Sequence, residues 1–426
     1  MAKDRRDDAK RLAWLDAVRG FAALLVVFDH GSTLLLQSAR DYLYHVLDFG
    51  EYGVFVFFLV SGYIIPASLE RKGSVRSFWI SRAFRLYPMF ALAVGASAIL
   101  YALRLGTLDG GEHHPFTSVT GWLLMLSNLL NGVNAPNVTW TLSYEMVFYL
   151  LIAALFSWNL HRRSGTWALT WAGVALILGG ILPMAAIAHW AARSGYGQPL
   201  MNVIADVVIL GGIVLAATER GKFTRIGGAV AALAALVLVT VNSTYPYAWS
   251  SGTILGLMFT GTLIYRADQG QVSKRKAAVI ATIVLAALVA AGVWHGYAYG
   301  GQWRAQWASS VLLAALTFGL ALTCRRFRIP GVLAWLGLIS YSVYLLHPLF
   351  FNAYRDIPAL HHAHPLSTQI WLALAILAVI VAASAATYYG VEKPMQRLGR
   401  VVARKLAAPR PSAGDGKETG PTTGRG

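Results

Sequence analysis

Residues 13–36 form the stretch AWLDAVRGFAALLVVFDHGSTLLL, which decides the fold class. It is apolar and long enough to cross a bilayer, which takes about 20 residues of helix. Yet it carries four ionisable residues, Asp16, Arg19, Asp29 and His30. A charged group at membrane depth costs several kcal/mol, roughly 2.5–3.5 on insertion scales, so such groups usually face a protein interior or a wet cavity. The stretch therefore predicts a membrane helix with one polar, functional face.

The two basic residues of this stretch have a helical spacing. Arg19 and His30 are eleven positions apart, which in an α-helix is about three turns and about 16 Å, so both lie on one face. We expect this face to line a polar shaft, with Arg19 near one membrane surface and His30 deeper. A histidine there can take a proton from a hydroxyl, because its unperturbed pKa is about 6.5. A structural hydrogen bond between helices is the alternative.

The composition is that of a membrane protein. The chain has 426 residues, of which 56% are hydrophobic and 13% charged, with a mean hydropathy of +0.53. A soluble domain carries about 25% charged residues, so we expect an all-α, polytopic transmembrane helix bundle of about ten to twelve spans. The single cysteine, Cys324, excludes an intramolecular disulfide and a thiolate metal cluster built by this chain. Twelve apolar runs are visible, at about 13–36, 52–69, 84–104, 143–160, 167–190, 200–217, 226–242, 249–266, 277–295, 306–324, 333–353 and 369–390.

The basic residues that give the chain its net charge of +17 are concentrated in particular loops. With the N-terminus inside, nearly all Lys and Arg residues fall in cytoplasmic segments, as the positive-inside rule requires. This pattern predicts two cytoplasmic termini and argues against nucleic acid as the partner. We expect a cytoplasmic segment at 1–12, a membrane domain at 13–395 and a basic, largely disordered tail at 396–426. Only five of the 36 basic residues fall outside: Arg40, Arg104, Arg193, Arg304 and Arg355.

The outer loops contain two further features. Residues 105–140 form the longest loop, and its semi-apolar piece, Ser118–Leu130, is expected to be re-entrant or to lie on the outer surface. Histidines cluster at two places in the outer loops. His113 and His114 lie in the long loop, and His361, His362 and His364 in another, where we expect solvated histidines rather than a metal site.

Two stretches near the first span carry candidate site residues. VFVFFLVSGY ends in Ser61, for which helix packing is favoured over a nucleophilic role because no G-x-S-x-G elbow surrounds it. Arg82 and Arg85 are three residues apart and share a helical face at the cytoplasmic entry. Paired guanidiniums suit phosphate groups, and an anchor for anionic lipid headgroups is the alternative.

Two later stretches add candidates inside the membrane. WTLSYEMVFY, at residues 140–149, holds Glu145 with Tyr144 and Tyr149 nearby. Glu145 is expected either to orient a hydroxyl or to pair with a cation. SYSVYLLHP, at residues 340–348, places His347 in the outer half of a span, where a structural hydrogen bond is favoured over direct chemistry.

Together these stretches resemble the membrane-bound acyltransferase-3 family. The similar pieces are LDAVRGFAALLVVFDH, FFLVSGY, RAFRLYP, TWTLSYE, SYSVYLLH and VEKP, in the family's order from residue 15 to residue 394. The family includes bacterial O-acetyltransferases that modify lipopolysaccharide, exopolysaccharide, Nod factor and some macrolides. The resemblance implies acetyl-CoA or another acyl-CoA as cytoplasmic donor, no metal, a multi-pass location in the bacterial inner membrane, and a carbohydrate acceptor, lipid-linked or free.

The resemblance also implies roles for residues. Arg82 and Arg85 would bind CoA phosphates, Arg19 would guide the thioester, and His30 would act as general base or be acylated itself. Glu145 would be a second catalytic residue. Supporting roles fall to Asp16, which is placed to pair with Arg19, and to Ser61, Tyr144, Tyr149 and His347.

Three other functions compete with a glycan O-acyltransferase. A permease for a sugar or other solute also has many spans with charges inside them. A scaffold for polysaccharide export would tolerate substitution of His30 and Arg82. An acyltransferase acting on a macrolide-type small molecule would keep the same site and change only the acceptor.

Overall fold

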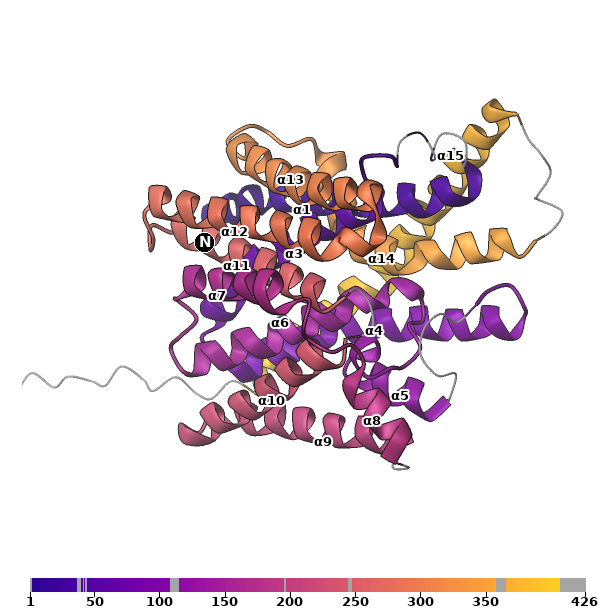
Figure 1. Cartoon of the computed structure of the whole chain (residues 1–426). Helices are drawn as coiled ribbons and strands as arrows, with labels where there is room; N and C mark the ends of the chain where they lie inside the picture. The colour runs from indigo at the N-terminus through magenta and orange to yellow at the C-terminus, as the bar shows by residue number, and fades with distance from the viewer. Residues whose placement is uncertain are drawn as a thin grey trace, which may run out of the picture.

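The computed structural model describes residues 2–36, 40, 42, 44–107, 115–194, 197–243, 247–357 and 365–406. Most of these residues lie in helices, and none of them forms a β-strand (Figure 1). The all-α fold is confirmed. In chain order the α-helices are α1 (Ala2–Leu35), α3 (Phe49–Lys72), α4 (Val75–Ala102), α5 (Pro115–Leu123), α6 (Trp140–Ser157), α7 (Ser164–Gly173), α8 (Ala186–Ser194), α9 (Gly197–Ala217), α10 (Lys222–Val241), α11 (Ala248–Asp268), α12 (Lys274–His295), α13 (Gly301–Cys324), α14 (Gly331–Arg355), α15 (Leu366–Thr387) and α16 (Lys393–Lys405).

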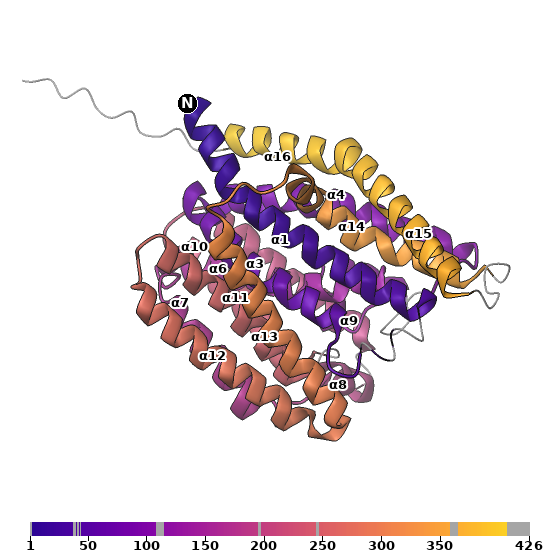
Figure 2. The same ribbon diagram turned by 90° about the horizontal axis from the view of Figure 1, so that it is seen from above.

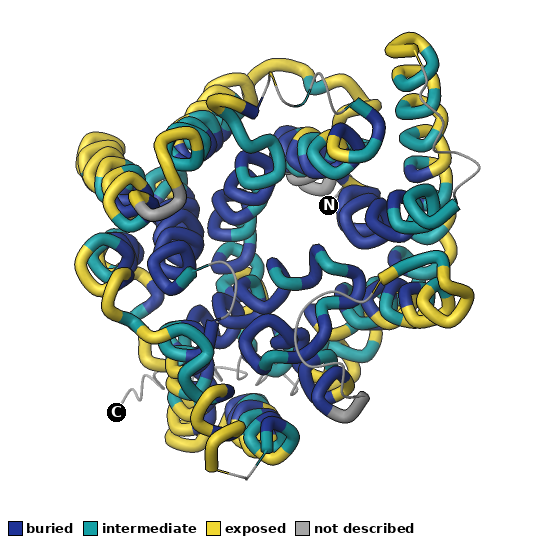
Figure 3. Tube along the Cα trace, turned by 45° about the vertical axis from the view of Figure 1, so that its right-hand side comes forward, coloured by how far each residue is buried: buried dark blue, intermediate teal, exposed yellow. Residues whose placement is uncertain are grey.

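The first helix packs between elements from both halves of the chain. α1 lies along α14 on one side and α3 on the other, and α3 in turn packs on α11 and α13. Figure 2 shows α1 across the middle of the bundle, with the N-terminus and α16 near the same end. Buried segments gather in the centre and exposed segments lie at the periphery (Figure 3). The polar face of α1 is therefore enclosed by other helices.

Ten helices among the described residues are long and apolar enough to cross a membrane. The expected range of ten to twelve is confirmed at its lower end, and two of the twelve apolar runs fall outside this set. The run at 167–190 is interrupted, because α7 ends at Gly173, a π-helical turn covers Val174–Leu178, and the chain turns again before α8. The run at 249–266 is α11. It has the length of a span, but it is buried almost throughout, so its Gly, Ser and Thr residues face protein.

The semi-apolar piece of the long loop at 105–140 enters the bundle. α5 is followed by two short 3-10 turns, Ser127–Leu129 and Asn137–Thr139, and the side chains between them are buried. The buried Asn242 side chain donates to the backbone oxygen of Leu129 (2.7 Å). This arrangement favours the re-entrant alternative over a surface segment.

The start of the expected tail is helical. α16 extends to Lys405, because its small Gly399 lets the helix lie against Phe84 of α4. Residues 396–405 of the expected tail are therefore helical. Residues 407–426, and the loop histidines at 113–114 and 361–364, lie outside the described residues.

A tight hairpin joins α3 to α4 and fixes the residues that both helices carry. Gly73 has a left-handed φ of 62°, and its N–H donates to the oxygen of Leu69 (2.9 Å), which ends α3. Ser74 then accepts from the N–H of Ser77 (3.1 Å) and starts α4. The hairpin sets Ser61 and Arg82 on neighbouring helices.

The crossing of α3 and α11 depends on two glycines. A Cβ at Gly62 would come within 1.9 Å of the oxygen of Met258, and a Cβ at Gly261 within 2.2 Å of the oxygen of Leu59. Both distances are far below contact, so the two backbones touch. Thr262 adds a hydrogen bond from its hydroxyl to the oxygen of Gly62 (2.8 Å).

We predict that Gly261→Val forces α3 and α11 apart. Overpacking typically costs about 1–3 kcal/mol, and the clash here is with backbone. The thermal unfolding midpoint of the detergent-purified protein should fall by several degrees. Gly95→Val is the matched control, because a Cβ at Gly95 meets no atom within 4 Å. Equal midpoints for the two variants would contradict this account of the crossing.

Candidate active site

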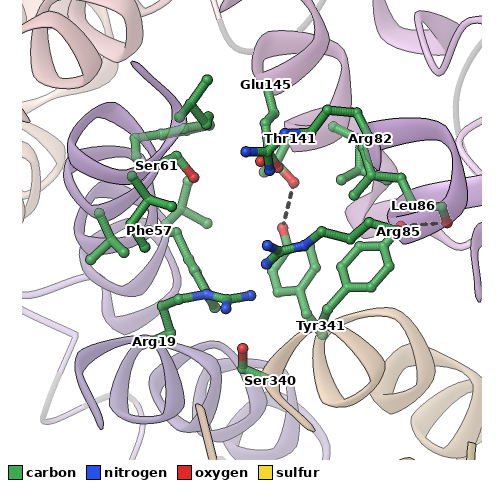
Figure 4. Close-up of a pocket in the computed structure, with 17 residues that line it drawn as sticks. Arg19, Phe57, Ser61, Arg82, Arg85, Leu86, Thr141, Glu145, Ser340 and Tyr341 are labelled. Atoms are coloured by element: carbon green, nitrogen blue, oxygen red, sulfur yellow. Dashed lines mark hydrogen bonds between the residues drawn. The ribbon is translucent and has the colours of Figure 1, made fainter. Parts of the chain in front are cut away.

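Three arginines expected to bind the donor converge on one cavity of about 70 Å³. Arg19 comes from α1, and Arg82 and Arg85 come from α4, and their guanidiniums point toward a common space (Figure 4). Glu145 of α6 and Ser61 of α3 line the same cavity. Helix α14 closes it with Ser340, Tyr341 and Tyr344. The structure thus brings together five residues predicted from separate stretches of sequence.

Acidic and aromatic groups hold these arginines. Asp16 lies 3.8 Å from Arg19 (Oδ1 to Nη1), as its spacing predicts. Tyr149 donates to Glu145 one turn earlier on α6, and the Arg82 guanidinium lies 5.1 Å from the Tyr149 ring centroid. A cation over an aromatic face is attracted by the ring quadrupole. Asp16 and the Tyr149 ring therefore each hold one arginine.

One further carboxylate was missed by the sequence analysis. Glu392 ends the π-helical turn Tyr388–Glu392 and is buried, although it follows the last apolar run. Ser342 of α14 donates to its Oε2 (3.2 Å), and Gln396 donates to its Oε1 (2.9 Å). It interacts electrostatically with Arg19 and Arg85. Single-turn π-bulges often occur at functional sites, but the stretch VEKP alone indicates only a helix end.

The two candidate histidines meet directly. Nδ1 of His30 lies 2.8 Å from Nε2 of His347, and the rings are nearly parallel, at 25°. Nδ1 of His347 lies 3.0 Å from the oxygen of Val343. A carbonyl only accepts, so this Nδ1 carries the proton, and a neutral His347 can then only accept at Nε2. His30 must donate from Nδ1, which leaves the lone pair of a neutral His30 on Nε2.

His30 is the more exposed member of this pair. The His30 side chain is 32% exposed, whereas His347 is fully buried. Nε2 of His30 lies 3.9 Å from Oδ2 of Asp29. A nitrogen with an available lone pair, oriented through its other ring nitrogen, is the arrangement of a general base. His347 holds His30 in position.

Polar groups surround the outer side of this histidine pair. Tyr44 donates to Asp29, and its backbone oxygen accepts from Gln302 (3.0 Å). Asp48 caps α3 by accepting from the N–H of Glu51 (2.8 Å). Burial, together with the nearby Asp29 carboxylate, raises the pKa of Asp48 to about 6. This side offers several acceptors to a hydroxyl-rich molecule.

Tyr344 lies between the cavity and the histidine pair. It lines the arginine cavity, and its ring centroid is 5.9 Å from that of His347 and 5.5 Å from that of Phe57. Its hydroxyl is 2.9 Å from the hydroxyl of Thr141. The sequence does carry a signal for this arrangement. Ser340, Tyr344 and His347 are four and then three residues apart, so they share one face of the helix.

Some of the predicted residues do not line the arginine cavity. The Tyr144 hydroxyl contacts Ser243 (2.7 Å) and Ser251 (2.9 Å), so it ties α6 to α11 and does not line the cavity. Neither histidine lines the cavity. Within the described ranges no three His, Cys, Asp or Glu residues are grouped to hold a metal ion.

Comparison with known proteins decides the family. The sequence matches the model Acyl_transf_3, described as an acyltransferase domain, over residues 12–389. The chain belongs to the acyltransferase-3 family. The match begins within α1 and ends at Tyr389, inside the π-helical turn, so it covers the arginine cavity and both histidines.

Curated relatives of this family member match shorter segments. "Acyltransferase MdmB" of Streptomyces mycarofaciens is 32% identical over 177 residues, which cover 39% of this chain and 44% of the relative. "Nodulation protein 10" of Rhizobium leguminosarum bv. viciae is 28% identical over 169 residues, which cover 35% of this chain and 46% of the relative. The chain thus spans less than half the length of the curated relatives it matches. No solved structure matches it.

The histidine geometry predicts a specific tautomer. In ¹⁵N spectra of histidine-labelled protein in lipid nanodiscs, neutral His30 should show a protonated Nδ1 and an unprotonated Nε2, because His347 accepts from Nδ1. The His30 signals are assigned by their loss in His30→Gln. Replacing the partner, in His347→Phe, should shift the population toward the Nε2–H form. A His30 that is protonated at Nε2 in the unaltered protein would contradict the assignment.

Proposed function

We propose that the protein is an integral membrane O-acyltransferase that moves an acyl group, acetyl above all, from cytoplasmic acyl-CoA to a hydroxyl of a cell-envelope glycan. One observation carries the proposal. The helix α1 presents Arg19 to a three-arginine cavity and His30 to a histidine pair, about three turns further along. Membership of an acyltransferase family supports the reaction class.

The arginine cavity would hold the donor. Guanidiniums bind phosphate groups through paired, charge-assisted hydrogen bonds, and three of them face this space. When bound, acyl-CoA supplies an activated thioester. The cavity of about 70 Å³ is far smaller than the roughly 300–1,000 Å³ of typical ligand pockets. Binding therefore requires the lining side chains to move apart.

The histidine pair would activate the acceptor. Nε2 of His30 takes the proton of the acceptor hydroxyl, while His347 keeps accepting from Nδ1 and stabilises the imidazolium that forms. The acceptor oxygen bonds to the acyl carbon, the carbon–sulfur bond breaks, and the thiol leaves with the proton from His30. Transient acylation of His30 at Nε2 is the alternative path. Glu145 acts with the arginines rather than on the hydroxyl.

Location and acceptor follow from the two ends of the site. The loops that carry most basic residues would face the cytoplasm of a bacterium across its inner membrane, with both termini inside. The histidine pair then lies toward the outside, where Asp29, Tyr44 and Asp48 offer hydrogen bonds to sugar hydroxyls. Lipid-linked and free glycans, lipopolysaccharide included, share this chemistry.

We predict that His30→Gln lowers acyl transfer by about 10²–10⁴-fold, the usual contribution of a general base. Cells that carry the variant or the unaltered gene are compared for O-acetyl content of their surface glycans by mass spectrometry, at equal membrane abundance. His189→Gln is the matched control, because this histidine is exposed and remote from the cavity. Unchanged acetylation in His30→Gln would refute its role as base.

We predict a different effect for Arg85→Lys. The positive charge stays, but the paired hydrogen bonds to phosphate are lost, so KM for acetyl-CoA should rise about tenfold while kcat changes less. Initial rates of radiolabelled acetyl transfer in membrane vesicles give both constants. Arg163→Lys, in an exposed loop, should leave them unchanged. An unaltered KM in Arg85→Lys would remove Arg85 from the donor site.

A further inference from the structure

A second and larger cavity lies on the side of α3 away from the arginines. Its volume is about 510 Å³, and it is bordered by α11, α12 and α13. Figure 2 shows α12 and α13 side by side at one edge of the bundle, and the two helices contact each other. Residues along their outer sides, such as Ile283 and Leu316, are exposed, as lipid-facing residues are.

We propose that this cavity, the α12–α13 crevice, binds one anionic phospholipid with its acyl chain between the helices and its phosphate at their basic ends. The space exists because small side chains occupy the facing positions, where larger ones would close it. They are Ala277, Ala278 and Ala281 on α12 and Ala315 and Gly319 on α13. At its inner end the crevice reaches Leu59 and Phe318, which belong to the hydrophobic core.

The mouth of the crevice is cationic. α12 begins where α13 ends, and both helix ends carry runs of basic residues. Lys274 and Arg325 line the cavity together with one carboxylate, Asp268. That carboxylate accepts from Tyr63 (2.6 Å) and pairs with Arg325 (2.5 Å). The basic residues at the two ends are Lys274, Arg275, Lys276, Arg325, Arg326 and Arg328.

This combination selects the occupant. A free phosphate would use the cationic mouth but not the apolar interior. A zwitterionic lipid would use the interior but gain little from six positive charges beside a single carboxylate. Basic residues next to a membrane attract anionic lipid by about 1 kcal/mol each. An anionic phospholipid uses both parts.

Another apolar cavity shows the contrast. Between α6, α7 and α10 lies a space of about 460 Å³ that is lined by Trp158, Trp167 and Trp171 and by no charged residue. It could take an acyl chain, but nothing in its lining selects a headgroup. Of these two cavities, only the α12–α13 crevice has both an apolar interior and charged residues in its lining.

The position of the lipid gives it a structural consequence. Leu59 faces the crevice, whereas its neighbours Phe58 and Val60 line the arginine cavity. An acyl chain packed against Leu59 would support α3 on the side that faces the crevice. The proposal does not depend on which reaction the arginine cavity serves.

Native mass spectrometry of the detergent-purified full chain tests the proposal. Phosphatidylglycerol and phosphatidylcholine with identical chains are titrated separately. We expect one phosphatidylglycerol to bind about tenfold more tightly than phosphatidylcholine. Gly319→Leu should weaken this binding about tenfold, because a side chain there meets no atom within 4 Å and can extend into the crevice. Lys274→Gln should weaken phosphatidylglycerol about fivefold and leave phosphatidylcholine unchanged.

The controls separate the crevice from the rest of the surface. Gly211→Leu places the same side chain at an equally open glycine on α9 and should bind lipid as the unaltered protein does. Inorganic phosphate alone should not displace the bound lipid. Equal affinity for the two lipids, equal binding by Gly319→Leu, or displacement by phosphate would each overturn the proposal. Monodisperse elution and an unchanged thermal midpoint verify that each variant is folded.

Discussion

Balanced charge burial inside the bundle is the constraint on which the rest of this structure depends. Three guanidiniums are held by α1 and α4, and removing even one ion from water costs several kcal/mol unless it is paired. The acidic groups that interact with them come from three places in the chain: Asp16, which pairs with Arg19 on α1, Glu145 on α6, and Glu392 after α15. The cluster therefore fixes the relative positions of four helices that are far apart in sequence, and α14 must carry hydroxyls to satisfy what remains.

Helix α11, which is buried inside the bundle, packs closely enough on α3 to accommodate this polar core. Because Gly62 and Gly261 bring the backbones of α3 and α11 into contact, α3 is held rigidly on one side while Ser61 faces the arginines on the other. Small residues at helix contacts are the usual means of close packing in membranes, where there is little hydrophobic force between helices. Small residues also occupy the facing positions of α12 and α13. There they leave a crevice, because no other helix fills the space between the two.

The sequence identified individual site residues but not which of them contact one another. Ionisable residues at membrane depth stand out in an apolar stretch, so Arg19, His30 and Glu145 could be found without a structure. The pairing of His30 with His347 joins positions 317 residues apart, and no local pattern encodes it. Glu392 was passed over because it follows the last apolar run, and only the π-helical turn directs it inward. Two of the twelve apolar runs do not qualify as spans by length and hydropathy: the run at 167–190 is broken by a π-helical turn, and the run at 249–266, α11, is rich in Gly, Ser and Thr.

The balanced charges also bear on how a donor could enter. On the proposed function, a phosphate must compete with carboxylates for these guanidiniums, since Asp16 pairs with Arg19 and Glu145 and Glu392 interact electrostatically with the arginines. The cavity of about 70 Å³ is too small for a donor while the arginines and Glu145 line it as they do here. Donor binding would then accompany cavity opening, and an Arg19 that turns to a phosphate would release Asp16. His30 lies outside the cluster, so its orientation through His347 survives this exchange, and the base remains in place whether or not the donor is bound.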